Sequence, residues 1–196
     1  MKASDGNHTM YFMAILCPPE VEAYVLSCKQ WMKAHFGCIV AMKSPAHVTL
    51  IPPFWFPLSR EAELITGMQY FTTDGAAIGI SLNGFSHFGK RVIYIVVEEN
   101  SALGRIKKSA ERHFHKQVGS SVQKDQRDFH PHVTIANRDL RPENFQEAWQ
   151  HFKDRRYRYQ YTTNSICLLR LTEGRWEVLA TKEWTEPDNS QGNAVI

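Results

Sequence analysis

The tripeptide His-Val-Thr occurs twice in this chain of 196 residues, at 47–49 and at 132–134, each time followed by a bulky aliphatic residue. With nine histidines in the chain, chance alone predicts roughly 0.03 such tripeptides, so the repetition is informative. Side chains two residues apart on a strand point to the same face, about 6.7 Å apart. Each copy therefore presents one imidazole and one hydroxyl together, and the candidate catalytic residues are His47, Thr49, His132 and Thr134.

Two imidazoles and two hydroxyls that face one cleft are suited to acid–base chemistry at a phosphodiester. A neutral imidazole accepts a proton from an attacking water, and an imidazolium on the other side protonates the oxygen that leaves. The unperturbed histidine pKa of about 6.5 suits both roles near neutral pH. The threonine hydroxyls would donate hydrogen bonds to non-bridging phosphate oxygens, where negative charge develops. The sequence leaves open which histidine is the acid and which is the base.

Three further residues near the motifs are candidates for binding substrate. Lys43 precedes the first motif, and Arg138 follows His132 by six residues, an even offset that places both on one face of a continuing strand. Either cation could contact phosphate or be an ordinary surface charge. Phe54 follows the first motif and could stack on a base, although core packing is the alternative for such a ring.

Composition indicates one globular domain with a mildly basic balance. Hydrophobic residues make up 43% of the chain and aromatic residues 12%, and the net charge is +3. This charge permits a phosphate-bearing ligand but does not indicate a duplex-binding surface. The apolar stretch 10–17 is too short to span a membrane and ends at a Pro-Pro pair. The four cysteines lack CxxC spacing, so we expect reduced thiols in a cytoplasmic protein without membrane attachment.

The elements that must position the motifs follow from hydrophobic periodicity and from turn signals. Each half shows the order apolar strand, helix, His-x-Thr strand, helix, strand. In the first half we expect strands at 11–16, 39–42, 47–51 and 76–83, with helices at 18–36 and 59–70, the second capped by Ser59. In the second half we expect strands at 91–98, around 132, at 157–171 and at 176–184, with helices at 101–117, capped by Ser101, and at 141–152.

The shared order indicates a diverged internal duplication of roughly 85 residues, the separation of the two histidines. The expected fold is α+β and bilobal, with antiparallel sheets flanked by helices and a pseudo-twofold axis through a central cleft. The single domain would span residues 9–186, with lobes of about 9–90 and 91–186. We expect a flexible N-terminus over 1–8 and a flexible tail over 187–196.

The chain resembles the two-histidine phosphoesterase superfamily, which includes 2′-5′ RNA ligases and cyclic phosphodiesterases. The resemblance is carried by PAHVTLIPPF (45–54) and FHPHVTIANR (129–138), by the order of elements, and by the C-terminal hairpin with Trp176. It implies an enzyme without cofactor or metal that acts on a nucleoside or RNA 2′,3′-cyclic phosphate or a 2′-5′ linkage. Hydrolysis and the reverse reaction, RNA ligation, both fit such a site.

Two other functions remain open at this stage. A non-catalytic module that binds RNA or nucleotides could use the same scaffold, with the histidines as phosphate contacts. A metal-dependent hydrolase could instead use His130 and His132, two residues apart on a strand, but no third ligand has matching spacing. We expect a nucleotide or an RNA end as the partner and a monomeric protein.

Overall fold

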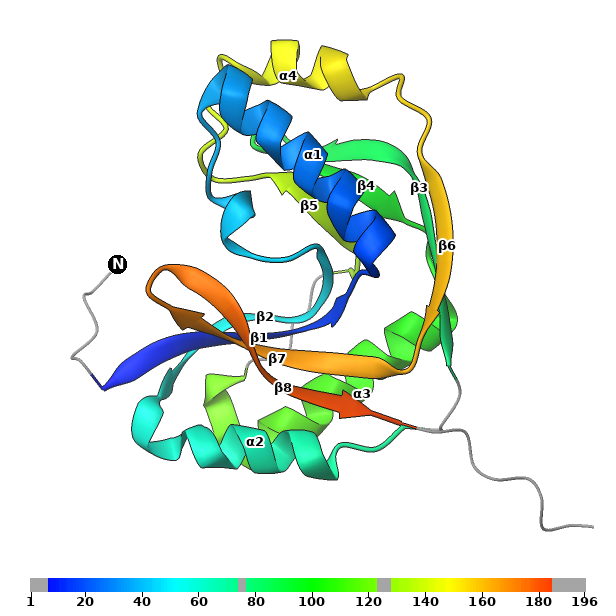
Figure 1. Ribbon diagram of the computed structural model, residues 1–196. Coiled ribbons are helices and arrows are strands. Elements are labelled where there is room, and N and C mark those ends of the chain that lie inside the picture. Colours follow the sequence, from blue (N-terminus) through cyan, green and yellow to red (C-terminus); the bar gives the residue numbers. More distant parts are fainter. Residues whose placement is uncertain (1–6, 74–76, 123–127, 185–196) are drawn as a thin grey trace, which may run out of the picture.

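The computed structural model describes residues 7–73, 77–122 and 128–184, which form two four-stranded antiparallel sheets with helices on their outer sides (Figure 1). The expected flexible ends, 1–8 and 187–196, lie almost entirely outside these ranges. The strands are β1 (His8–Leu16), β2 (His47–Pro57), β3 (Ile78–Phe88), β4 (Val92–Val97), β5 (His132–Ala136), β6 (Arg158–Thr163), β7 (Ser165–Thr172) and β8 (Arg175–Glu183). The helices are α1 (Pro19–Phe36), α2 (Glu61–Tyr70), α3 (Ser101–Val118) and α4 (Phe145–Phe152), and short 3₁₀ turns are η1 (Ala41–Lys43), η2 (Leu58–Arg60) and η3 (Gly119–Ser121).

The expected α+β class with two antiparallel sheets is confirmed, but the strands do not follow the division into lobes at residue 90. One sheet has the order β2-β1-β7-β8 and the other the order β5-β4-β3-β6. Strand β3 of the first half therefore pairs with β4 of the second, while β7 and β8 join β1. Periodicity along the chain does not reveal which strands pair, and here the first half gives β3, and the second half gives β7 and β8, to the other sheet.

The helices cross between the sheets in the same way. Helix α1 follows β1 but contacts β5 of the other sheet, and α3 follows β4 but packs on β2 and α2. Figure 1 shows α1 and α4 on one sheet and α2 and α3 beneath the other. The two halves are therefore interwoven, and one continuous buried cluster joins apolar residues from both sheets.

Local signals account for the ends of the helices. Helix α1 has proline in its first turn and ends at Gly37, whose φ of 67° is the left-handed conformation expected of a C-terminal glycine. The cap of α3 is Asn100 rather than the expected Ser101, because the Asn100 side chain accepts hydrogen bonds from the backbone N–H groups of Ala102 and Leu103. The expected cap Ser59 lies in η2, one turn ahead of α2.

Two strand expectations in the first half are wrong. The stretch 39–42 is not a strand; it leads into η1, and the N–H groups of Ile39 and Val40 bind Asp139 Oδ2 at 2.6 and 2.7 Å. Strand β2 continues through Pro52-Pro53 to Pro57. Prolines are tolerated there because β2 is the edge strand of its sheet and its register with β1 is irregular at that point. The sheet therefore loses no hydrogen bond for lack of a proline N–H group.

The expected long strand 157–171 is two strands that belong to different sheets. Strand β6 pairs with β3, and after Asn164 the chain continues as β7, which pairs with β1. The polar stretch 162–165 marks the point where the chain crosses from one sheet to the other. The hairpin between β7 and β8 turns at Glu173-Gly174 as expected, with φ of 49° and 77°, the positive pair that a tight two-residue turn requires.

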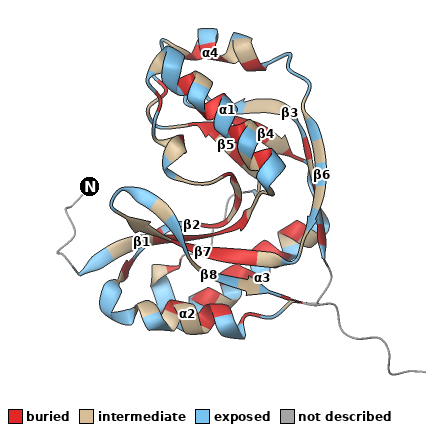
Figure 2. Ribbon diagram, in the orientation of Figure 1, coloured by how far each residue is buried: buried red, intermediate tan, exposed pale blue. Residues whose placement is uncertain are grey.

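Buried residues concentrate on the faces of the sheets that meet helices (Figure 2). A second, smaller cluster lies on the other face of the sheet that contains β1, and it consists of Phe12, Ala14, Cys167 and Leu169 with Leu16 and Trp176 against them. Successive strand residues alternate between faces, so β1 contributes to both clusters. In the described part of the chain, no helix is long and apolar enough to cross a bilayer.

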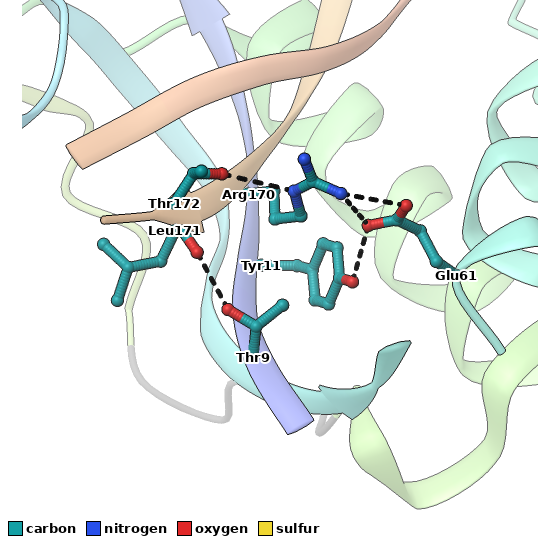
Figure 3. A network of polar contacts seen from close by, with 6 residues as sticks. All are labelled: Thr9, Tyr11, Glu61, Arg170, Leu171 and Thr172. Atoms are coloured by element: carbon teal, nitrogen blue, oxygen red, sulfur yellow. Dashed lines mark hydrogen bonds and ion pairs between the residues drawn. The ribbon is translucent and has the colours of Figure 1, made fainter. Parts of the chain in front are cut away.

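A polar network ties β1 and β7 to helix α2 (Figure 3). Tyr11, fully buried on β1, donates a hydrogen bond from its hydroxyl to Glu61 Oε2 at 2.7 Å. Arg170 of β7 forms an ion pair with the same carboxylate at 3.0 Å. Burial and the neighbouring carboxylate raise the pKa of Tyr11, so the phenol stays a donor.

This network predicts that Tyr11→Phe destabilises the fold without creating a cavity. We expect a loss of about 1.5–3 kcal/mol in the free energy of unfolding, because a hydrogen bond to a charged acceptor is lost. Urea unfolding measures the change. Tyr70→Phe is the matched control because Tyr70 is exposed; equal stability of the two variants would contradict the role given to this network.

Candidate active site

The two His-x-Thr strands are the edge strands of their sheets, and they lie against each other. Strand β2 begins one sheet and β5 begins the other, and the two strands are in contact. In each motif the valine is fully buried, while the histidine and threonine on the opposite face are half-buried. The strand alternation expected from the sequence is therefore present in both copies, and the pairs His47–Thr49 and His132–Thr134 lie on the open faces.

Both imidazoles are held by the same backbone contact. His47 Nδ1 lies 2.7 Å from the carbonyl oxygen of Pro45, and His132 Nδ1 lies 2.7 Å from that of His130. A carbonyl oxygen only accepts hydrogen bonds, so each Nδ1 must carry the proton. The other ring nitrogen, Nε2, is then the one that accepts or delivers a proton.

Aromatic rings of the neighbouring strands hold the imidazoles from the side. Phe12 of β1 lies 4.7 Å from His47 between ring centroids, and Tyr94 of β4 lies 5.1 Å from His132. Phe88 adds an edge-on contact with His132 at 5.0 Å. Each histidine is therefore fixed by a carbonyl at Nδ1 and by an aromatic ring from the adjacent strand.

The surroundings lower the pKa of both histidines. Burial lowers the pKa of His47 to about 4, and the charges of Lys29 and His132 act in the same direction. Burial lowers the pKa of His132 below its ordinary value; the hydrogen bond to the His130 carbonyl opposes this effect, and the charge of the His130 side chain adds to it. The strands that carry the two imidazoles, β2 and β5, are in contact. Both rings are neutral at pH 7 in the free protein.

A cavity of about 830 Å³ opens beside this pair. Thr49 and His132 belong to its wall. The remaining lining residues come from β2, α3, the end of β3 and the segment before β5, and they are Leu50, Pro52, Pro53, Phe88, Lys107, Asp128, Phe129 and His130. This volume lies in the range of small-molecule sites, and the mixture of apolar walls with a few polar groups is typical of them.

The three expected substrate-binding residues lie away from this cavity. Phe54 is 8% exposed and packs against Tyr11 and Phe56, so its side chain belongs to the core and the base-stacking expectation is wrong. Arg138 is exposed on a turn after β5 has ended. Its even offset from His132 therefore does not place the two side chains on one face of a strand. Lys43 is exposed at the end of η1 and lines two smaller cavities with Arg175.

Sequence reasoning missed Lys107, which lines the cavity from α3. The signal was present: Leu103, Ile106, Ala110 and Phe114 form the apolar stripe of this helix, and Lys107 lies within it at the i+4 position from Leu103. A lysine inside an apolar stripe is either paired or functional. The cavity rings Phe88 and Phe129 carried no comparable signal, since tertiary contacts alone bring them to β5.

The segment that carries the Pro45 carbonyl is held by two charged side chains of α1. Lys29 is 3% exposed, and its ammonium donates to the Ser44 carbonyl oxygen at 2.9 Å. Glu22, also on α1, accepts a hydrogen bond from the Ala46 N–H. Burial lowers the pKa of Lys29, and the Glu22 carboxylate opposes that effect. The orientation of His47 thus depends on a helix that packs on the other sheet.

The histidine, cysteine and carboxylate side chains do not form a candidate metal cluster where the structure can be described. Within residues 7–73, 77–122 and 128–184, no group of three or more such side chains could hold an ion. His130 lies on the cavity wall next to His132. All four cysteines are free thiols, as expected from their spacing.

The sequence matches the model of the 2′-5′ RNA ligase superfamily over residues 18–175, and the chain belongs to this superfamily. The resemblance carried by the two His-x-Thr motifs is therefore confirmed at the level of the family. The assignment identifies a class of phosphoesterases and ligases. Among curated proteins, none matches the chain in sequence.

Solved structures share the fold at low sequence identity. The crystal structure of TT0787 from Thermus thermophilus aligns with a TM-score of 0.65 and 16% identity, over 91% of this chain and 99% of that one. E. coli LigT in complex with 3′-AMP aligns with a TM-score of 0.63 and 16% identity, over 91% and 99%. Its complex with NADP⁺ gives 0.63 and 18%, over 92% and 99%. Structural similarity at identities this low establishes the shared fold but does not identify the substrate of this chain.

The buried Lys29 on α1 predicts a clear effect of a single charge deletion. Lys29→Met should lower the free energy of unfolding by about 1–3 kcal/mol, because the Ser44 carbonyl oxygen loses its hydrogen-bond donor. Chemical denaturation monitored by tryptophan fluorescence measures this loss. Lys33→Met, on the exposed side of the same helix, should stay within about 0.5 kcal/mol of the parent. A Lys29 variant as stable as the Lys33 variant would show that Lys29 does not hold this segment.

Proposed function

We propose that this protein is a metal-independent phosphodiesterase that opens nucleoside or RNA 2′,3′-cyclic phosphates by paired-histidine acid–base catalysis. The observation that carries the proposal is the matched pair of imidazoles on contacting edge strands, each with Nδ1 bonded to a carbonyl and Nε2 left for proton transfer. Membership of the 2′-5′ RNA ligase superfamily supports phosphodiester chemistry. Cleavage of a 2′-5′ linkage would use the same groups.

In the proposed reaction, His47 is the base and His132 is the acid. The lower pKa belongs to His47, so its Nε2 is the more readily available lone pair and takes a proton from water as the oxygen attacks phosphorus. His132, whose pKa is lowered less, gives its Nε2 proton to the ribose oxygen as the phosphorus–oxygen bond breaks. Thr49 and Thr134 donate hydrogen bonds to the non-bridging oxygens. The product is a phosphomonoester with one free ribose hydroxyl.

Lys43 and Arg138 lie outside the large cavity, and this limits the roles they can have in substrate binding. We propose that Lys43 and Arg138 contact only the part of an RNA substrate that extends beyond the nucleotide at the histidines. Both are exposed, and neither is among the described residues that line the large cavity. The four free thiols support a reducing compartment such as the cytoplasm. A monomer suffices for the mechanism because one chain supplies both histidines.

The decisive test is hydrolysis of the four nucleoside 2′,3′-cyclic monophosphates in EDTA. We expect turnover by the parent and a fall in kcat/KM of at least about 100-fold in both His47→Ala and His132→Ala, because each variant removes one proton transfer. His8→Ala is the control, since His8 is exposed at the start of β1. A loss in only one of the two variants would contradict the paired mechanism. Binding of the nucleotides without turnover by the parent would instead indicate a binding module.

The pH dependence of kcat/KM provides an independent test. The base must be neutral, so the rate rises through the His47 pKa of about 4. The acid must be protonated, so the rate falls through the His132 pKa, which lies below 6.5. We expect a bell-shaped profile with its maximum on the acidic side of pH 6.5, because kcat/KM reports the free enzyme. His130→Ala should move the descending limb to higher pH, since it removes a like charge beside His132. A profile that is flat from about pH 5 to 9 would exclude the mechanism.

A further inference from the structure

The large cavity contains one cation that the proposed reaction does not use. Lys107 is only 7% exposed, although lysine is almost never buried without a partner. It reaches the cavity from α3, whereas the histidine motifs come from β2 and β5. A buried ammonium in the wall of a cavity next to a candidate reaction site indicates contact with a ligand.

The immediate surroundings of Lys107 orient its ammonium. Its Nζ forms an ion pair with Glu111, one turn further along α3, and lies 5.4 Å from the centroid of the Phe129 ring. Among the residues that the structure describes, Glu111 is the one hydrogen-bond acceptor of this ammonium. An ammonium has three donors, so one directed at Glu111 and one over the ring leave a third for an acceptor in the cavity.

The composition of the cavity indicates which part of a nucleotide lies there. The phosphate must sit between His47 and His132, and only His132 belongs to the cavity wall, so the cavity extends to one side of the reaction site. Its other walls are mainly apolar or aromatic, including the rings of Phe88 and Phe129. Aromatic walls suit the flat face of a base, which stacks on such rings. A lone buried donor among these walls is suited to reading the edge of that base.

We propose that Lys107 selects the nucleobase, favouring bases with a carbonyl oxygen at purine position 6 or pyrimidine position 4 over bases with an amino group there. Lysine only donates hydrogen bonds, so it pairs with the O6 and N7 acceptors of guanine and meets an amino donor at the matching position of adenine. Uracil and cytosine differ in the same way. The proposal rests on the proposed function for the orientation of the nucleotide, and it assigns a base preference to a residue outside both motifs.

The test compares guanosine, inosine and adenosine 2′,3′-cyclic phosphates. Inosine keeps O6 but lacks the guanine amino group, so equal rates for guanosine and inosine would exclude the amino group as the recognised feature. We expect kcat/KM for both to exceed that for adenosine by about tenfold in the parent, the scale of one hydrogen bond to a charged group. The parent hydrolysing all three equally would overturn the proposal.

The main variant removes Lys107 and its ion-pair partner Glu111 together. In Lys107→Met/Glu111→Gln both charges are removed, and the preference should fall to within about twofold. Lys108→Met, which removes the exposed neighbouring cation, should keep the preference. If the double variant weakens every nucleotide and inorganic phosphate by one common factor, Lys107 binds phosphate and the base-reading role is wrong.

Calorimetric binding of 3′-GMP and 3′-AMP separates this proposal from the proposed function. Tighter binding of 3′-GMP that disappears in the double variant supports the role of Lys107 even if the parent hydrolyses no cyclic phosphate. Turnover of cyclic phosphates combined with equal binding of the two monophosphates would overturn the role of Lys107 and leave the proposed function intact.

Discussion

The hydrogen bond from each imidazole Nδ1 to the carbonyl oxygen two residues earlier is the constraint on which the candidate site depends. It fixes the ring tautomer, because a carbonyl cannot donate, and it leaves Nε2 of His47 and His132 for chemistry. The carbonyl is itself positioned by the segment before each strand. For His47 that segment is held by Lys29 and Glu22 of α1. The positions of the two imidazoles are therefore determined by the backbone segment that precedes each motif strand.

The interwoven topology explains how two edge strands can form a stable site. An isolated edge strand exposes unpaired backbone groups, but β2 and β5 cover each other where the sheets meet. Each half of the chain contributes a helix and at least one strand to the other sheet, so the sheets cannot separate without disrupting the shared buried cluster. The network of Tyr11, Glu61 and Arg170 adds a polar connection between β1, β7 and α2. Rigid support of this kind keeps the two imidazoles in one relative position.

Local features of the fold could be predicted from the sequence, whereas pairings between distant segments could not. The class, the two motif strands, helix α1 with its Gly37 cap and the turn at Glu173-Gly174 all follow from nearest-neighbour rules. The division into lobes failed because strand exchange leaves no periodic signal. The side of the sheet on which Phe54 lies depends on two register irregularities between β1 and β2, which the sequence does not reveal. Arg138 does not share the face of His132 because β5 ends before it. Lys107 could have been found, since a lysine in an apolar stripe conflicts with the pattern around it.

Burial favours the neutral form of both imidazoles, although the acid must be protonated. Bound substrate can restore the protonated form of that imidazole. Removing a histidine from water favours its neutral form, which suits a base but not an acid. With both pKa values lowered, the free site holds no imidazolium at neutral pH. A bound phosphodiester brings a negative charge, which stabilises the protonated form of a nearby imidazole and raises its pKa. The acid would therefore be generated by substrate binding rather than stored in the resting protein. It follows that the descending limb of kcat should lie at higher pH than that of kcat/KM, because only kcat reports the occupied site.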